Sequence, residues 1–431
     1  MKFEWYTDFV DLEYTPSSDE LLAFFKVTPD KGITLEEAAG RIASESSIGT
    51  WTTLTTMTPD LKKLMAKAYY ISADGLVKIA YPLELFELDN IPQILSSVAG
   101  NIFGMRAIKF LKLLDIRFPR KLIDHYRGPE HGIEGVRRIL KVYGRPITAT
   151  VVKPKVGLTT ERYAEEAYKI LSGGIDLLKD DENLSSQGFN PFEKRLNAVM
   201  KVIEKIERET GEKKGYLINV TAETREAERR IKLVADYGNP FIMIDILTVG
   251  WGALQTLREL AHDYKLAIHA HRAFHAAFTR MKEHGMTMLV VAKLARLIGV
   301  DHIHVGSPVG KMEAKTMDVL NIQKCITEKT YEPATFKAFK QDWGNLKPVL
   351  PVSSGGLHPG LLPETVKIMG TDILIQVGGG VTGHPAGSFS GARAVRQALD
   401  AIKEGVSLEE YAETHPELKQ ALDKWGHVRP K

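Results

Sequence analysis

The sequence predicts an α/β fold: a C-terminal (β/α)8 TIM barrel over residues 126–431, preceded by an α+β ferredoxin-like domain over residues 1–125. Three observations favour this fold class. The chain of 431 residues exceeds the size of most single domains, so two are expected. The first region orders its segments βαββαβ, which is typical of a ferredoxin-like domain. In the second region, apolar β-rich segments alternate with helical segments, which indicates parallel βα units.

The elements of the first region follow from local signals. Thr34-Leu35-Glu36-Glu37 is a capping box that opens a helix. Asp74-Gly75 is a hairpin turn signal between two β-rich segments. We expect strands over residues 20–28, 66–72, 76–81 and 106–118, and helices over 34–43 and 91–98.

The second region contains eight strand candidates, and eight βα units are the number that closes a barrel of about 250 residues. The expected strands are 148–153, 175–179, 216–221, 241–247, 266–271, 302–305, 350–354 and 374–377. The expected helices are 161–171, 191–207, 225–237, 253–262, 287–298, 313–324, 363–369 and 391–402.

Composition excludes several classes of partner. A net charge of +3, with 44% apolar and 26% charged residues, gives no argument for nucleic acid or membrane binding. The single cysteine, Cys325, excludes an intramolecular disulfide and fits a reducing compartment. No apolar segment reaches membrane-spanning length and the first residues lack an apolar signal core, so a cytoplasmic location is expected.

The chemistry centres on the end of the second barrel strand. Apolar residues lead into Lys179, and Asp180, Asp181 and Glu182 follow at once. In an extended segment, positions i and i+2 share a face, so Lys179 and Asp181 should point the same way. Asp181 and Glu182 could give two oxygen ligands to a hard cation such as Mg²⁺. The alternative is a solvated acidic turn that caps the next helix.

Polar residues stand at the same end of all eight predicted strands. Catalysis in such barrels takes place at the C-terminal strand ends. In strand order, these residues are Lys153 and Lys155; Lys179 to Glu182; Asn219 and Thr221; Asp245; His269, His271 and Arg272; His302 and His304, followed by Lys311; Ser353 to Gly356; and Gly378 to Gly380.

Two anion sites are expected on this rim. Glycine-rich turns after strands seven and eight would let backbone N–H groups approach a phosphate. Arg272 and His304 could hold a second phosphate, while Lys153, Lys155 and Lys311 add positive charge. A metal between two anion sites suits a short sugar bisphosphate, because a metal beside a carbonyl acidifies the adjacent C–H.

These motifs resemble those of the ribulose-1,5-bisphosphate carboxylase/oxygenase (Rubisco) large subunit, over nearly the whole chain, and look most like the archaeal form III type. The acidic cluster at Lys179 is similar to that family's metal-binding signature. The supporting segments are 45–53, 100–104, 153–155, 271–273, 302–304, 310–311, 354–356 and 378–385.

The resemblance implies Mg²⁺-dependent addition of CO2 to ribulose 1,5-bisphosphate, giving two 3-phosphoglycerates, with a competing reaction with O2. Lys179 would carry an activating CO2 as a carbamate and, with Asp181 and Glu182, would bind the metal. Its neighbouring carboxylates favour the charged ammonium, and we expect Mg²⁺ to reverse that preference. The other implied catalytic residues are Lys153, His271 and Lys311.

The resemblance also implies the substrate contacts and the partners. Lys155 would orient substrate groups, Arg272 and His304 would bind one phosphate, and Ser354 a hydroxyl. The second phosphate would contact Thr50, Trp51, Gly355, Gly356, Gly378 and Gly379.

Glu45 and Asn101 would reach the site from a second subunit, which implies a homodimer with shared active sites and higher oligomers of dimers without a small subunit. The archaeal likeness suggests AMP and nucleoside salvage.

Three alternatives remain at this point. A Rubisco-like enolase or isomerase would act on another phosphorylated sugar without fixing CO2. A metal hydrolase with a carbamylated lysine also uses a His-x-His motif, as at His269 and His271, but on a different strand. A non-enzymatic binding or scaffolding barrel would not require the lysines and carboxylates together.

Overall fold

The computed structural model describes residues 4–309 and 315–430, and it divides the chain into two compact units. One unit combines the described part of Met1–Arg127 with Phe274–Leu297 and Glu328–Leu346. The other unit comprises Gly128–Ala273, the described part of Ile298–Thr327, and the described part of Lys347–Lys431. Each unit is therefore built from segments that are far apart in the sequence.

The first unit has the ferredoxin-like order that the sequence predicts. Its sheet has the strand order β10-β4-β1-β3-β2, in which β1 pairs antiparallel with both β3 and β4. The short strand β10 joins β4 in parallel. The elements are β1 (Leu21–Pro29), α1 (Leu35–Glu45), β2 (Lys67–Ile71), β3 (Leu76–Tyr81), α2 (Ile91–Val98), β4 (Ile108–Arg117) and β10 (Gly285–Met286).

Buried polar contacts hold the two later segments in the first unit. Lys293, on α11 (Met288–Ile298), forms a fully buried ion pair with Asp115 of β4, with an N–O distance of 2.7 Å. The backbone N–H of Phe339 donates to the other Asp115 oxygen at 2.7 Å. Lys112 donates from Nζ to four backbone carbonyls between residues 278 and 284, at 2.6–3.2 Å.

The second unit is a closed barrel of eight parallel strands in the order β11-β14-β15-β5-β6-β7-β8-β9. Closure leaves no unpaired strand edge. This confirms the predicted barrel. The strands are β5 (Ile147–Val151), β6 (Leu177–Lys179), β7 (Gly215–Asn219), β8 (Phe241–Asp245), β9 (Ala267–His271), β11 (His302–His304), β14 (Leu350–Ser354) and β15 (Leu374–Gln376).

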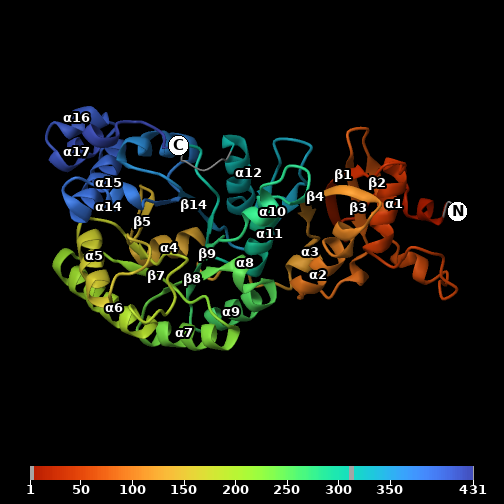
Figure 1. Cartoon of the computed structure of the whole chain (residues 1–431), viewed down its shortest axis with the longest axis horizontal. Coiled ribbons are helices and arrows are strands. Elements are labelled where there is room, and N and C mark those ends of the chain that lie inside the picture. Colours follow the sequence, from red (N-terminus) through yellow and green to blue (C-terminus); the bar gives the residue numbers. More distant parts are fainter. Residues whose placement is uncertain (1–3, 310–314, 431) are drawn as a thin grey trace. The chain divides into compact units, whose positions relative to one another are not determined.

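Amphipathic helices follow the strands, and α5, α6, α7 and α9 succeed one another around the outside of the barrel (Figure 1). In α6, for example, Phe192, Leu196, Val199, Ile203 and Ile206 are buried at helical spacing. The helices of this unit include α5 (Thr160–Ser172), α6 (Phe192–Thr210), α7 (Thr224–Asp236), α9 (Trp251–Asp263), α12 (Thr316–Thr327), α13 (Leu362–Met369), α15 (Gly387–Glu404), α16 (Leu408–Ala412) and α17 (Pro416–Trp425).

The apolar core of the barrel lies toward the N-terminal ends of its strands. Helix α4 (Gly132–Leu140) contributes Ile133, Val136 and Leu140 to the same buried cluster as the first residues of several strands. Those strand residues are Ile147, Leu177, Phe241, Ala267, Leu350 and Leu374. Because apolar side chains fill the N-terminal end of the barrel, the polar side chains of the strands lie at its C-terminal end.

None of the described helices combines the length and the apolar character that crossing a lipid bilayer requires.

The Asp115–Lys293 pair gives a test of the first unit. Removing one partner of a buried pair leaves an unpaired charge in the core, which typically costs about 3–5 kcal/mol. Lys293→Met should lower the free energy of unfolding by that amount in denaturant titrations. The control Lys205→Met removes an exposed pair with Glu209 and should cost less than about 1 kcal/mol. Equal, small effects of the two changes would contradict the role given to this pair.

Candidate functional site

The C-terminal ends of the barrel strands gather the side chains that the sequence singles out. Each parallel strand ends at the same rim, so residues distant in sequence become neighbours. Final strand residues include Lys179 on β6, Asn219 on β7, Asp245 on β8, His271 on β9, His304 on β11 and Ser354 on β14. Lys153 and Gly378 follow β5 and β15.

Lys179 is fully buried at the end of β6, and its Nζ donates to the backbone carbonyl of Asp180 at 2.8 Å. The pKa of Lys179 is lowered from its usual value, since burial outweighs the neighbouring carboxylates of Glu182, Asp245 and Asp181. The sequence-based expectation considered the carboxylates alone and therefore favoured the ammonium. The structure shows that loss of hydration is the larger effect.

Asp181 lies beside Lys153. Lys153 Nζ is 2.9 Å from Asp181 Oδ2, while the side-chain Nδ2 of Asn183 donates to Oδ1 at 2.9 Å. Burial alone would raise the pKa of Asp181. The hydrogen bonds from Lys153 and Asn183 lower the pKa by more than burial raises it, so the net shift is downward. Asp181 is therefore held as a carboxylate, the form that ligates a cation.

His271 lies between two carboxylates. Its Nδ1 is 2.7 Å from Asp245 Oδ1, and its Nε2 is 3.6 Å from Glu182 Oε2. The contact with Asp245 fixes the orientation of the ring, which leaves Nε2 directed toward Glu182. This arrangement places a potential acid or base next to the acidic cluster.

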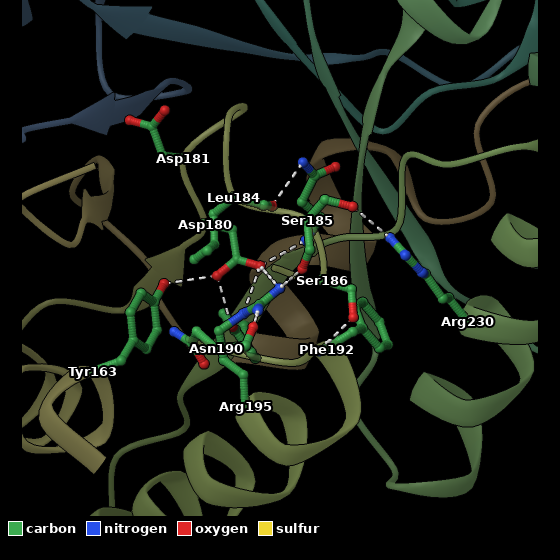
Figure 2. A network of polar contacts seen from close by, with 12 residues as sticks. Tyr163, Asp180, Asp181, Leu184, Ser185, Ser186, Asn190, Phe192, Arg195 and Arg230 are labelled. Atoms are coloured by element: carbon green, nitrogen blue, oxygen red, sulfur yellow. Dashed lines mark hydrogen bonds and ion pairs between the residues drawn. The ribbon is translucent and has the colours of Figure 1, made fainter. Parts of the chain in front are cut away.

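Asp180 faces the opposite way from its neighbours. It is fully buried and accepts hydrogen bonds from Tyr163 Oη (2.7 Å), Tyr216 Oη (2.6 Å), the backbone N–H of Asn219 (3.0 Å), and Nε and Nη2 of Arg195 (3.3 and 3.1 Å). Figure 2 shows Asp181 directed away from this network. Sequence reasoning missed the supporting role of Asp180, although the alternation of side chains along a strand was a usable signal.

Three histidines form a continuous chain inside the barrel. His269 Nε2 is 2.9 Å from His304 Nε2, and His269 Nδ1 is 3.3 Å from His302 Nδ1. His304 Nδ1 is 2.8 Å from Ser354 Oγ. Burial lowers the pKa of His269 and His304 well below the usual range and that of His302 to about 4, so all three rings are neutral near pH 7.

The glycine turns lie at the same rim. Gly355 and Gly356 have φ values of 109° and 81°, a backbone region that residues with a Cβ rarely adopt. A Cβ added to Gly378 would lie 3.5 Å from Lys153 Cε, so the turn after β15 runs next to the Lys153 side chain. Gly379 begins the short helix α14 (Gly379–Thr382). Backbone groups and a cation are thus available to an anion here.

The remaining predicted site residues lie after barrel strands, outside the described residues, or in the other unit. Arg272 directly follows β9, and Lys155 lies exposed in the loop after β5. Lys311 lies outside the described residues. Four further residues belong to the other unit: Glu45 ends α1, Thr50 and the exposed Trp51 follow it, and Asn101 begins the 3-10 helix η4 (Asn101–Gly104).

A closed parallel barrel with lysines, carboxylates and histidines at its C-terminal rim defines an α/β-barrel enzyme. The family model "Ribulose bisphosphate carboxylase large chain, catalytic domain" matches residues 132–425, and the corresponding N-terminal domain model matches residues 8–122. The chain belongs to this family.

Curated relatives and solved structures agree with the family models. The chain is 52% identical to ribulose bisphosphate carboxylase from Pyrococcus furiosus, covering 100% of both chains, and 50% identical to that from Archaeoglobus fulgidus, covering 100% and 99%. The dimeric archaeal Rubisco from Hyperthermus butylicus superposes with a TM-score of 0.94 at 58% identity, covering 98% of this chain and 100% of that one. The octameric Rubisco from Pyrococcus horikoshii gives 0.93 at 50% identity, covering 100% and 99%. Membership of a carboxylase family removes the metal-hydrolase and scaffolding alternatives.

Proposed function

We propose that the chain adds CO2 to ribulose 1,5-bisphosphate and cleaves the product to two molecules of 3-phosphoglycerate, with O2 as a competing reactant. The observation that carries the proposal is the fully buried Lys179, whose pKa is lowered by burial, beside Asp181 and Glu182. Curated relatives over the whole chain, named ribulose bisphosphate carboxylase, support the same reaction.

Activation would begin at Lys179. The neutral amine attacks a CO2 molecule, an N–C bond forms, and one proton leaves to give a carbamate anion. The burial of Lys179 supports this step, because it favours the uncharged amine over the ammonium. A carbamate also supplies an oxygen ligand to a metal ion, whereas an ammonium group at the same position would repel it.

Mg²⁺ would be held by the Lys179 carbamate, Asp181 and Glu182. The donor set fits, since all three offer the oxygen atoms that this hard cation prefers. Carbamylated Lys179 would add a third oxygen ligand to those of Asp181 and Glu182. When bound, Mg²⁺ would polarise the substrate carbonyl and acidify the adjacent C–H.

The remaining steps use side chains of the rim. Lys179, once carbamylated, would take the C3 proton, and the enediolate so formed would make a C–C bond with the substrate CO2. His271, oriented by Asp245, serves the addition of water and the cleavage that follows. Lys153 protonates the carbanion left by cleavage.

Substrate contacts follow the anion sites. Arg272 and His304 would bind one phosphate, Ser354 a substrate hydroxyl, and Lys155 would orient groups near the acidic cluster. The other phosphate would contact Thr50, Trp51, Gly355, Gly356, Gly378 and Gly379. The family resemblance implies that Lys311 would stabilise the new carboxylate.

The biological setting is proposed from the sequence motifs and the relatives. The archaeal likeness of the sequence motifs suggests an enzyme of the archaeal form III type that acts in the salvage of AMP and other nucleosides in the cytoplasm, and the relatives from Pyrococcus furiosus and Archaeoglobus fulgidus are carboxylases by name. The dimeric and octameric Rubiscos of Hyperthermus butylicus and Pyrococcus horikoshii support a homodimer, or an oligomer of dimers, without a small subunit.

Product analysis tests the reaction. With ribulose 1,5-bisphosphate, Mg²⁺ and ¹⁴C-labelled bicarbonate, we expect labelled 3-phosphoglycerate, because the fixed carbon enters one of the two product carboxylates. An enzyme that only enolises or isomerises its substrate would exchange the C3 proton with solvent but yield no labelled product. That second result would favour the Rubisco-like alternative.

Subunit complementation tests the shared site that Glu45 and Asn101 imply. Glu45→Gln and Lys179→Ala homodimers should both be inactive, because each lacks one half of every site. Co-refolded mixtures should recover activity at up to about a quarter of the sites, since each symmetric heterodimer contains one intact site. Mixtures that demonstrably contain heterodimers and yet remain inactive would exclude this sharing.

A further inference from the structure

Two buried ion pairs lie on either side of β6, the strand that ends in Lys179. Before the strand, Asp176 accepts hydrogen bonds from Nη1 and Nη2 of Arg145, both at 2.7 Å. After the strand, Asp180 pairs with Arg195 at 3.1 Å, and both side chains are completely buried. The two pairs are alike in chemistry but lie at opposite ends of the strand, and only the second is next to the acidic cluster.

Arg195 also reaches the turn that follows the acidic cluster. Its Nη1 donates to the backbone carbonyl of Asn190 at 2.7 Å, and its Nη2 donates to the carbonyl of Ser185 at 2.7 Å (Figure 2). Arg230 fixes the same turn through Ser185 Oγ, at 2.9 Å. One guanidinium therefore joins the Asp180 side chain to two points on the turn.

Asn219 holds the intervening backbone. Its Nδ2 donates to the carbonyls of Glu182 and Leu184 at 3.3 and 3.1 Å, while its own N–H donates to Asp180 at 3.0 Å. Asp181 and Glu182 thus lie between an anchored Asp180 and an anchored Leu184–Ser185. The backbone that carries the two carboxylates therefore cannot shift without breaking these hydrogen bonds.

We propose that Arg195 is a positioning residue for the metal centre: through Asp180 and the carbonyls of Ser185 and Asn190, it holds Asp181 and Glu182 in the arrangement that a divalent cation requires. The inference rests on the proposed function, which places the cation at those carboxylates. Mg²⁺ demands nearly ideal octahedral geometry, so a small displacement of two ligands lowers its affinity. Changes to residues that orient metal ligands typically weaken binding 10–100-fold.

The test measures metal binding directly, with Mn²⁺ as the probe. Free Mn²⁺ is followed by electron paramagnetic resonance during titration of the full-length protein, in CO2-saturated and CO2-free buffer. Arg195→Lys keeps the charge but loses the planar fork that contacts Asp180 and both carbonyls. We expect its Kd for Mn²⁺ with CO2 to rise about 10–100-fold. Excess Mg²⁺ should restore much of its carboxylation rate.

The matched controls are the corresponding changes at the other end of β6. Arg145→Lys disrupts a largely buried pair, with 11% of the Arg145 side chain exposed, so it should also lower the melting temperature yet leave the Kd for Mn²⁺ unchanged. Arg195→Met and Arg145→Met repeat the comparison with the positive charge removed. If the methionine variants do not fold, the lysine variants alone are sufficient for the test.

Wild-type affinity in the Arg195 variants, or an equal loss in the Arg145 variants, would overturn the proposal, since the effect would then be absent or merely structural. Wild-type protein that binds no Mn²⁺ in a CO2-dependent manner would instead remove the proposed metal centre itself, and this inference with it. The two failures are therefore distinguishable.

Discussion

The buried carboxylate of Asp180 is the constraint on which the site depends. A carboxylate without water is costly unless hydrogen bonds replace its hydration, and here two tyrosines, an arginine and a backbone N–H do so. Burial and the charge of Asp180 raise the pKa of Tyr163 and Tyr216 well above the usual value, so both hydroxyls stay protonated donors. With Asp180 fixed behind the strand, its neighbours Lys179 and Asp181 must face the other way.

Burial at this strand end also determines the pKa of Lys179. Carboxylates near a lysine stabilise its ammonium, yet at this strand end the loss of hydration has the larger effect and lowers the pKa. A neutral amine among carboxylates is the form that reacts with CO2. The charge balance of the site therefore follows from the depth of Lys179 in the barrel as much as from its neighbours.

The barrel was predictable because its strands carry strong local signals. The expected strand at residues 175–179 appears as Leu177–Lys179, and that at 350–354 appears as Leu350–Ser354. The gathering of Lys153, Asp181, His271 and Ser354 followed from the rule that catalytic residues lie at C-terminal strand ends. Local pattern and this rule were sufficient for these positions.

Contacts between residues far apart in the sequence determine the features of the fold and the site that the sequence did not indicate. Segments 274–297 and 328–346 belong to the first unit because of pairs such as Asp115–Lys293, whose members are 178 residues apart. Periodicity contains no such information. Likewise, alternation along the strand can place Asp180 and Asp181 on opposite faces. Only the structure identifies Tyr163, Tyr216 and Arg195 as the partners of Asp180.

The central claim is that Lys179 reacts with CO2, and direct observation of the carbamate tests it best. The protein would be incubated with ¹³C-labelled CO2 and Mg²⁺, and its carbamate signal recorded by ¹³C NMR beside that of Lys179→Ala. The account predicts a Mg²⁺-stabilised carbamate signal in the wild type that is missing from the variant. An identical signal in both proteins, or none in a wild type that fixes CO2, would contradict it.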